Sequence, residues 1–158
     1  MAAPTPAART TPAGIPLKDG YKTTITITYD ADISFWEVTV TPPGIDGGDG
    51  IDQTTMFNDR FRVSLNRALL TLTECSCTAA YDPAVFDQIV SAVNRNTTIT
   101  ITFPDLSTLA FYGWLRVFTP DALVEGTQPR ASITIQPSNW DPTNKVEAGP
   151  LLTSVYGT

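Results

Sequence analysis

The chain has 158 residues and a formal net charge of −6 at pH 7, from 10 Lys and Arg against 16 Asp and Glu. This length is typical of one domain with a substantial core, and the acidic balance disfavours tight binding of nucleic-acid phosphates, which needs a Lys/Arg surface. The sequence has no histidine, which excludes Ser-His-Asp and Cys-His catalysis and every His-containing metal site.

The two cysteines, Cys75 and Cys77, are two residues apart. On a strand they share a face, and a disulfide over so short a span would be strained, so we expect two small buried or interfacial side chains. A four-ligand zinc site is not expected.

Residues 1–15 lack the basic start and apolar core of a signal peptide, and no run reaches transmembrane length. These features favour a soluble protein made in a reducing, intracellular compartment.

The N-terminal part of the chain predicts an arm followed by two strands. Residues 1–20 are rich in Ala, Pro and Thr without periodicity, which predicts an N-terminal arm, either a disordered tail or a segment that orders on a partner. Residues 22–29 (KTTITITY) and 34–41 (SFWEVTVT) alternate apolar and polar side chains. We expect them to pair as a hairpin around the polar break at 30–32.

Residues 42–56 (PPGIDGGDGIDQTTM) predict a long loop, because four glycines, two prolines and three aspartates leave no apolar period. Such long loops in compact domains are usually functional or disordered. The run DGGDGID suggests calcium, but it departs from the EF-hand pattern, which has acidic residues at alternate positions and a final Glu. We therefore expect a surface loop that becomes ordered against a neighbour.

Residues 61–65 and 70–81 predict two further strands, and a helix follows at 82–94. Asp82 is suited to cap the helix and Pro83 to occupy its first position. One apolar stripe at helical spacing should pack on a sheet. This predicted helix packing face consists of Val85, Phe86, Ile89, Val90 and Val93.

The segment 96–137 contains the clearest strand patterns. Ile99, Ile101 and Phe103 alternate with threonines from 98 to 102, and isoleucines alternate with Ser and Thr from 132 to 135. Residues 109–118 are apolar at nearly every position, so this strand should be covered on both faces. The sequence thus predicts a mainly β domain over 21–140, an antiparallel β-sandwich or barrel with one flanking helix. Residues 141–158 predict a C-terminal tail with enough apolar residues to dock.

No motif in the chain predicts an enzyme or a cofactor. Phosphate-binding loops, G-x-S-x-G and H-E-x-x-H are absent. A pair of carboxylates on different strands is compatible with glycoside hydrolysis, but each is more simply a solvated charge. The candidates are Glu37, Glu74, Asp87 and Asp105.

Threonines line one side of several predicted strands. Thr98, Thr100, Thr102 and Thr134 belong to this set. Two interpretations stay open: ordinary β-propensity on a solvent face, or a smooth polar wall.

The order of elements resembles the major tail tube protein of long-tailed, non-contractile bacteriophages. The resemblance spans residues 20–140. It is carried by the helix entry TAAYDPAVFDQIVSAV, by the strand pair ending in FYGWLRVFTPDA, and by the closing segment VEGTQPRASITIQPSNWD. These stretches are typical of the family and carry no catalytic signature.

The resemblance implies a structural virion protein without a cofactor. Such proteins form hexameric rings that stack into a hollow tube, through which genomic DNA enters the host without specific binding. Partners would be other copies and the tail proteins at the tube ends, with assembly in the host cytoplasm and no membrane. An acidic or neutral lumen agrees with the net charge.

The resemblance also assigns regions of the surface. The loop after the first hairpin would reach a neighbouring ring, and the terminal arms would help to join rings. The implied inter-ring contact loop comprises Pro43, Ile45, Asp46, Asp49, Ile51, Asp52, Met56 and Phe57, and the candidate lumen or seam face comprises Thr98, Thr100, Thr102 and Thr134.

A function of another class is a monomeric carbohydrate-binding β-sandwich module. Exposed aromatic rings can stack on sugars. The candidate rings are Trp36, Trp114, Trp140 and Tyr112. A small hydrolase that uses carboxylates is a third hypothesis.

Overall fold

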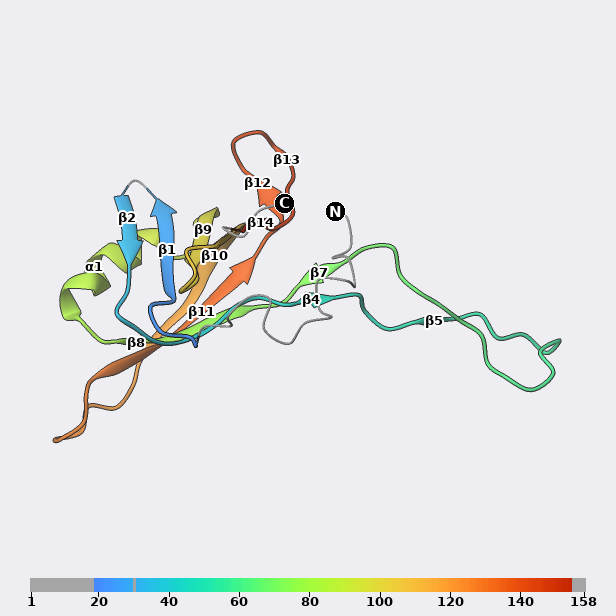
Figure 1. Ribbon diagram of the computed structural model, residues 1–158, viewed down its shortest axis with the longest axis horizontal. Coiled ribbons are helices and arrows are strands. Elements are labelled where there is room, and N and C mark those ends of the chain that lie inside the picture. Colours follow the sequence, from blue (N-terminus) through green and yellow to red (C-terminus); the bar gives the residue numbers. More distant parts are fainter. Residues whose placement is uncertain (1–18, 30, 155–158) are drawn as a thin grey trace.

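A computed structural model of the chain describes residues 19–29 and 31–154, so residues 1–18 of the predicted N-terminal arm and the last four residues of the tail lie outside the described part. The described chain is mainly β with one short helix, which confirms the predicted fold class. Figure 1 shows a body of strands from which one long, narrow hairpin extends along the longest axis of the molecule.

One large sheet forms the body. Its strands are β1 (Thr24–Tyr29), β2 (Ala31–Ser34), β3 (Glu37–Thr41), β8 (Cys75–Ala80), β9 (Thr97–Thr102), β10 (Thr108–Pro120), β11 (Arg130–Pro137) and β14 (Leu151–Thr153). Three small ribbons pair β4 (Ile45–Asp46) with β7 (Thr71–Leu72), β5 (Ile51–Asp52) with β6 (Ser64–Leu65), and β12 (Trp140–Asp141) with β13 (Val146–Glu147). Every one of these strand pairs is antiparallel.

The strand order shows that the sheet curls into a barrel. The order is β2-β1-β9-β10-β11-β8-β3, with β14 beside β10. The two edge strands, β2 and β3, are joined only by Phe35 and Trp36. Because a residue advances the chain by no more than about 3.6 Å, the opposite edges of the sheet must lie close together. The flat order of strands therefore closes on itself at a seam between the β1–β2 pair and β3.

The predicted pairing of residues 22–29 with 34–41 is wrong. Tyr29 lies opposite Ala31, so β1 pairs with the short β2, whereas β3 pairs with β8 at the other edge of the sheet. The run 34–41 is interrupted at its buried Phe35 and exposed Trp36, where the chain crosses the seam. Local alternation revealed the strands but not this change of partner.

The core fills the inside of the barrel. Its buried side chains come from all the long strands and from the helix: Ile25, Ile27, Ile33, Cys75, Cys77, Ala79, Ile89, Ala92, Ile99, Ile101, Phe111, Leu115, Ile133 and Ile135. The alternating residues of each strand face outward. In β10, Tyr112 and Trp114 on this outer side are only half-buried. The prediction that this strand is covered on both faces is therefore wrong for the described chain, because the curled sheet encloses only its inner face.

The helix α1 (Pro83–Ala92) begins as predicted. The Asp82 carboxylate accepts a hydrogen bond of 2.9 Å from the N–H of Ala84, and Pro83 occupies the first turn. Figure 1 shows the helix beside the strands of the body.

Only part of the predicted helix packing face touches the core. Ile89 is buried, and Val85 and Val93 pack against the core cluster. Phe86 and Val90 are exposed, although the Phe86 ring lies 6.1 Å from that of Phe118. The barrel therefore covers only a part of the predicted apolar face of this ten-residue helix.

Candidate functional site: the arm and the pocket at its base

The predicted loop 42–56 is one leg of a long hairpin. Residues 42–73, called the arm below, leave the body after β3 and return to it at β8 (Figure 1). The β4–β7 pair forms the base of the arm, and the β5–β6 pair lies further out. The predicted strand 61–65 is reduced to Ser64–Leu65, because the leg has no sheet to lie on.

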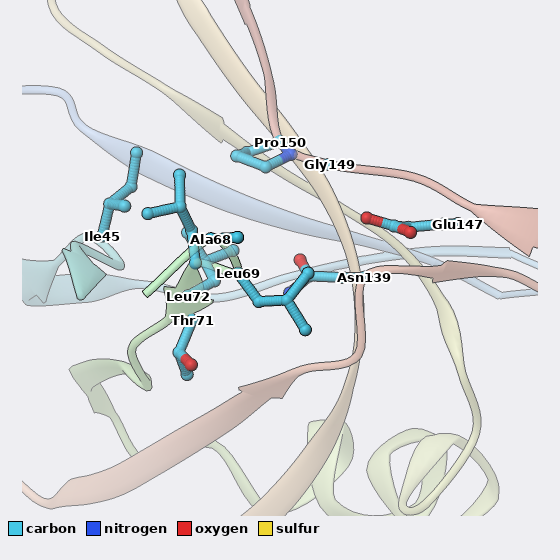
Figure 2. Close-up of a pocket in the computed structure, with 10 residues that line it drawn as sticks. Ile45, Ala68, Leu69, Thr71, Leu72, Asn139, Glu147, Gly149 and Pro150 are labelled. Atoms are coloured by element: carbon cyan, nitrogen blue, oxygen red, sulfur yellow. The ribbon is translucent and has the colours of Figure 1, made fainter. Parts of the chain in front are cut away.

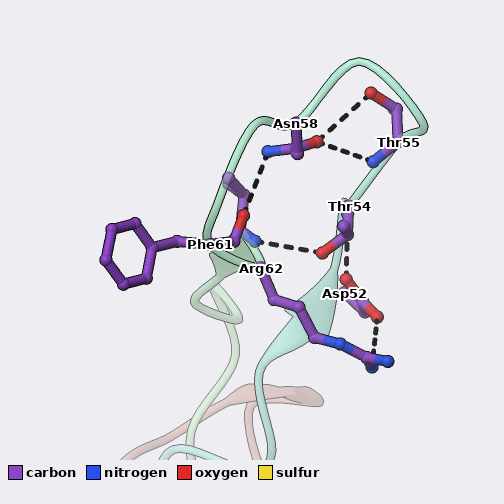
Figure 3. A network of polar contacts seen from close by, with 7 residues as sticks. Asp52, Thr54, Thr55, Asn58, Phe61 and Arg62 are labelled. Atoms are coloured by element: carbon purple, nitrogen blue, oxygen red, sulfur yellow. Dashed lines mark hydrogen bonds and ion pairs between the residues drawn. The ribbon is translucent and has the colours of Figure 1, made fainter.

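Polar contacts between the two legs hold the arm together. The Gln53 N–H donates to the Val63 carbonyl at 2.8 Å, and the Val63 N–H donates to the Thr54 hydroxyl at 3.0 Å. Near the end of the arm, the Asn58 side chain accepts from the Thr55 N–H at 2.8 Å (Figure 3). Two legs joined by hydrogen bonds have fewer conformations than a free loop, so the tip is presented in a defined place.

Charges also link the two legs. Arg62 forms an exposed ion pair of 3.6 Å with Asp52, and the Arg67 Nε donates to the Asp49 carbonyl at 2.8 Å. Hydrogen bonds from Thr54 lower the pKa of the Asp52 carboxyl below its usual range. The Asp46 carboxylate accepts from the Gly48 N–H at 2.8 Å. Two of the three aspartates that suggest calcium therefore make contacts within the arm through their carboxylates.

The tip of the arm exposes large apolar side chains. Met56 is 101% exposed, Phe57 96% and Phe61 79%. Figure 3 shows the Phe61 ring pointing away from the polar network. Exposed apolar residues grouped at the end of a projecting element are typical of an interaction site.

The structure places the predicted contact loop along the first leg of the arm. Pro43 is half-buried at its base, and the other seven members are exposed. Ile45 and Asp46 form β4, Ile51 and Asp52 form β5, and Met56 and Phe57 reach the tip.

An apolar pocket of about 280 Å³ opens at the base of the arm. We call it the base pocket. Its lining residues are Ile45, Ala68, Leu69, Leu70, Thr71, Leu72, Asn139, Glu147, Gly149 and Pro150. Figure 2 shows the arm residues on one side and Asn139 and Glu147 on the other, with the Glu147 carboxylate turned toward them. No local sequence pattern predicts this pocket, because its second wall includes Glu147, Gly149 and Pro150 of the predicted tail.

The threonine face lies on the outside of the barrel. Three directly opposed threonine pairs join β1 to β9, namely Thr24–Thr102, Thr26–Thr100 and Thr28–Thr98. Thr134 lies on β11, on the far side of β10, and all four predicted residues are half-buried. The face is neutral and hydroxyl-rich where β1 and β9 meet.

The candidate carboxylates have separate places. Glu37 accepts a hydrogen bond of 2.7 Å from the Ile25 N–H, and Glu74 pairs with Arg116 at 2.6 Å. Asp87 is exposed on the helix, and Asp105 accepts from the Ser107 N–H at 3.0 Å. Within the described ranges, no group of three or more His, Cys, Asp or Glu is placed to hold a metal ion.

The four candidate aromatic rings are also distributed over different elements. Trp36 lies at the seam and is 73% exposed, Tyr112 and Trp114 lie on the outer face of β10, and Trp140 lies on β12. A hollow at the seam is lined by residues of β1 and β3, and Trp36 is the one of these four rings that lines it. In the described part of the chain, no helix is both long and apolar enough to span a membrane.

Comparison with solved structures shows where this fold occurs. A chain of the sixfold-symmetrised anti-feeding prophage baseplate superposes with a TM-score of 0.65 and 6% identity, covering 89% of this chain and 98% of that chain. A chain from the tail of an empty gene transfer agent particle with C6 symmetry gives 0.59 and 10%, covering 87% and 100%. This chain therefore shares its fold with a chain of that baseplate and a chain of that tail.

A third similar structure is a chain from the sheath–tube complex of an extracellular contractile injection system in its extended state. Its TM-score is 0.59 with 16% identity, and the match covers 97% of this chain and 100% of that chain. No family model and no curated protein matches the sequence. The similarity is therefore one of fold, at sequence identities of 6%, 10% and 16%.

Proposed function

We propose that this protein is a structural subunit, and not an enzyme, of the tail tube of a phage-like particle. Six copies form a ring, and rings stack into a tube through which DNA passes into a host cell. The observation that carries the proposal is the arm, which exposes Met56, Phe57 and Phe61 at its end, where a single copy of the chain leaves them uncovered. The fold is similar to that of chains from a sixfold-symmetrised baseplate and from a tail with C6 symmetry.

The arm would make the contact between rings. An isolated two-stranded ribbon is at most marginally stable in water. Burial of its apolar side chains against a neighbour contributes roughly 25 cal/mol per Å² of area removed from water. The members of the contact loop from Ile45 to Phe57 lie along the leg that projects from the body, so a neighbouring ring would cover them on contact.

The threonine face is proposed to line the lumen or a seam between subunits. Opposed threonine pairs across β1 and β9 provide hydroxyl groups without positive charge. Together with a net charge of −6, such a wall would let DNA pass without the counterion release that produces affinity. The proposal covers tubes with and without a sheath, because one similar chain comes from a sheath–tube complex.

Imaging of the purified full chain by electron microscopy tests the proposal. We expect rings or tubes, with sedimentation velocity showing hexamers or larger species. A protein that remains monomeric at high concentration, and forms no ring in native particles, would contradict it.

A variant with a shortened arm tests the role of this hairpin. Asp46 lies opposite Thr71, so residues 47–70 can be replaced by Asn-Gly, which favours a two-residue hairpin turn. We expect this variant to keep the thermal transition of the barrel and to lose stacking. Tubes of normal length from it would show that the arm is not the contact between rings.

A further inference from the structure

We propose that the base pocket receives the arm tip of a second copy of this chain. In this contact, Phe57 enters the apolar part of the pocket and Arg60 binds Glu147 and Asn139. The inference rests on the proposed function, because it names the surface that a projecting arm would meet on the next subunit.

The apolar part of the base pocket is suited to an aromatic side chain. Leu69 and Leu70 are 82% and 65% exposed, and with Ile45 they line a pocket of about 280 Å³. A cavity of about 150 Å³ lined by aliphatic groups is large enough to bind benzene. The base pocket therefore has room for one phenyl ring and the side chain next to it.

The polar corner of the pocket lacks a donor. The Asn139 Oδ1 is buried and accepts no hydrogen bond from the described residues. A buried acceptor without a donor costs free energy, so a turn of the Asn139 side chain toward an N–H group brought by an occupant of the pocket is favoured. Glu147 lines the same corner and forms no ion pair within the described ranges.

The arm tip has the complementary chemistry. Phe57 is 96% exposed, and Arg60 forms no ion pair in the described part of the chain. A guanidinium has five N–H donors, enough to bind the Glu147 carboxylate and the Asn139 Oδ1 together. Arg62 is already paired with Asp52, so Arg60 is the cation available at the tip.

Charge distinguishes this tip from the other projecting hairpin. The connection between β10 and β11 also exposes apolar residues, with Leu123 68% and Val124 61% exposed. Its charged residues are Asp121 and Glu125, which would repel Glu147. The arm tip also carries a carboxylate, Asp59, but it presents the guanidinium of Arg60 beside it, whereas residues 121–129 contain no cation. Of the two hairpin ends, the arm tip is therefore the one that can offer a positive charge to Glu147.

The occupant must come from a second copy. Figure 1 shows the tip at one extreme of the long axis and β4 and β7 close to the body, so an arm cannot fill the pocket at its own base. A contact from the tip of one copy to the base of the next is heterologous, and its repetition produces rings or open stacks.

A charge-reversal cycle tests the pairing in the full chain. We expect Arg60→Glu and Glu147→Arg each to raise the concentration needed for assembly by about tenfold, since each replaces an attraction with a repulsion. The double variant should restore assembly to within about threefold of the wild type if the two groups face one another. Sedimentation velocity over a concentration series measures each value.

The matched control is Glu125→Arg on the other hairpin. Glu125 is also acidic and exposed, but we expect its reversal to leave the Arg60→Glu defect uncorrected. Rescue of Arg60→Glu by Glu125→Arg would place the tip against that hairpin and overturn the proposal. Phe57→Ala should weaken assembly more than Leu123→Ala, because in the proposed contact Phe57 enters the base pocket and Leu123 does not.

Disulfide trapping between two differently tagged copies gives a second measurement. One copy carries Phe57→Cys and the other Ala68→Cys, and burial raises the pKa of the native Cys75 and Cys77 thiols to about 12, so they do not compete. We expect a mixed-tag dimer on a non-reducing gel. A mixture that yields only same-tag dimers would refute the tip-to-pocket contact.

These results separate the inference from the proposed function. If the wild type forms tubes while the cycle shows no coupling and no mixed-tag dimer appears, the tube function stands and the base pocket is not the acceptor. If the wild type forms neither rings nor tubes, both are wrong.

Discussion

The backbone N–H of Ile25 donates a hydrogen bond of 2.7 Å to the carboxylate of Glu37, across the seam of the barrel. Ile25 pairs with Ile101 of β9 on one side, whereas β2 pairs with β1 only from Thr26 onward. The Glu37 side chain therefore takes the place of a neighbouring strand at this position. A residue that the sequence offers as a catalytic carboxylate instead closes the sheet.

Replacement of Glu37 should destabilise the barrel according to whether an acceptor remains. We expect Glu37→Ala to lower the free energy of unfolding by about 1–3 kcal/mol, because it leaves the Ile25 N–H without its partner. Glu37→Gln keeps an acceptor oxygen, so we expect its loss in the free energy of unfolding to be about half that of Glu37→Ala or less. Urea denaturation measures both. An equal loss in the two variants would show that the charge matters more than the hydrogen bond.

Gly113 lies where the backbone of β11 approaches β10 closely. A Cβ atom at this position would lie 2.5 Å from the Gln136 carbonyl oxygen and 3.2 Å from the Pro137 Cα, both of them backbone atoms. We expect Gly113→Ala to destabilise the fold by about 1–3 kcal/mol through forced backbone movement. Gly20→Ala is the control, since nothing lies within 4 Å of its Cβ. Matching thermal transitions for the two variants would contradict this account.

The sequence predicted the parts of the fold that depend on local patterns. Alternation identified β1 and β9, whose isoleucines are buried, and the Asp82-Pro83 pair identified the start of α1. The prediction of strand pairing was wrong where the partner of a strand is decided by distant residues. β3 pairs with β8, which is more than thirty residues away in the chain, and periodicity contains no information on that choice.

The candidate site could be predicted only in part. Glycines and aspartates marked 42–56 as a special segment, yet the second leg of the arm was missed because its exposed apolar residues resemble a core strand. The base pocket joins Leu72 of the arm to Glu147 and Pro150 of the predicted tail. Its shape follows from the tertiary path of the chain, which no local pattern records.

The Asp82 cap gives a prediction for the helix. Asp82→Ala removes the acceptor for the Ala84 N–H and should cost about 1 kcal/mol of stability, whereas Asp82→Asn retains it. Asp87→Ala, at an exposed position of the same helix, is the control and should change the unfolding midpoint little. Circular dichroism during thermal unfolding measures the three variants. A larger loss for Asp87→Ala would point to a different role for the first turn.

The buried thiols predict a specific dependence of stability on alkaline pH. Burial raises the pKa of Cys75 and Cys77 from an ordinary value of 9.0 to about 12. Below pH 9 the thiols are protonated in both states, so their contribution to stability is fully present. Between pH 9 and about 12 they ionise only in the unfolded state, which draws the equilibrium toward unfolding.

The urea midpoint of the wild type should therefore fall between pH 8 and pH 10.5 more steeply than that of a Cys75→Ala, Cys77→Ala double variant. The alanines leave a cavity and lower stability at every pH, so the comparison is one of slopes and not of absolute midpoints. All other titratable groups are common to both proteins, so their contributions cancel in this comparison. Parallel slopes would mean that the thiols ionise in the folded barrel, and reaction of the native protein with a thiol reagent at pH 8 would lead to the same conclusion.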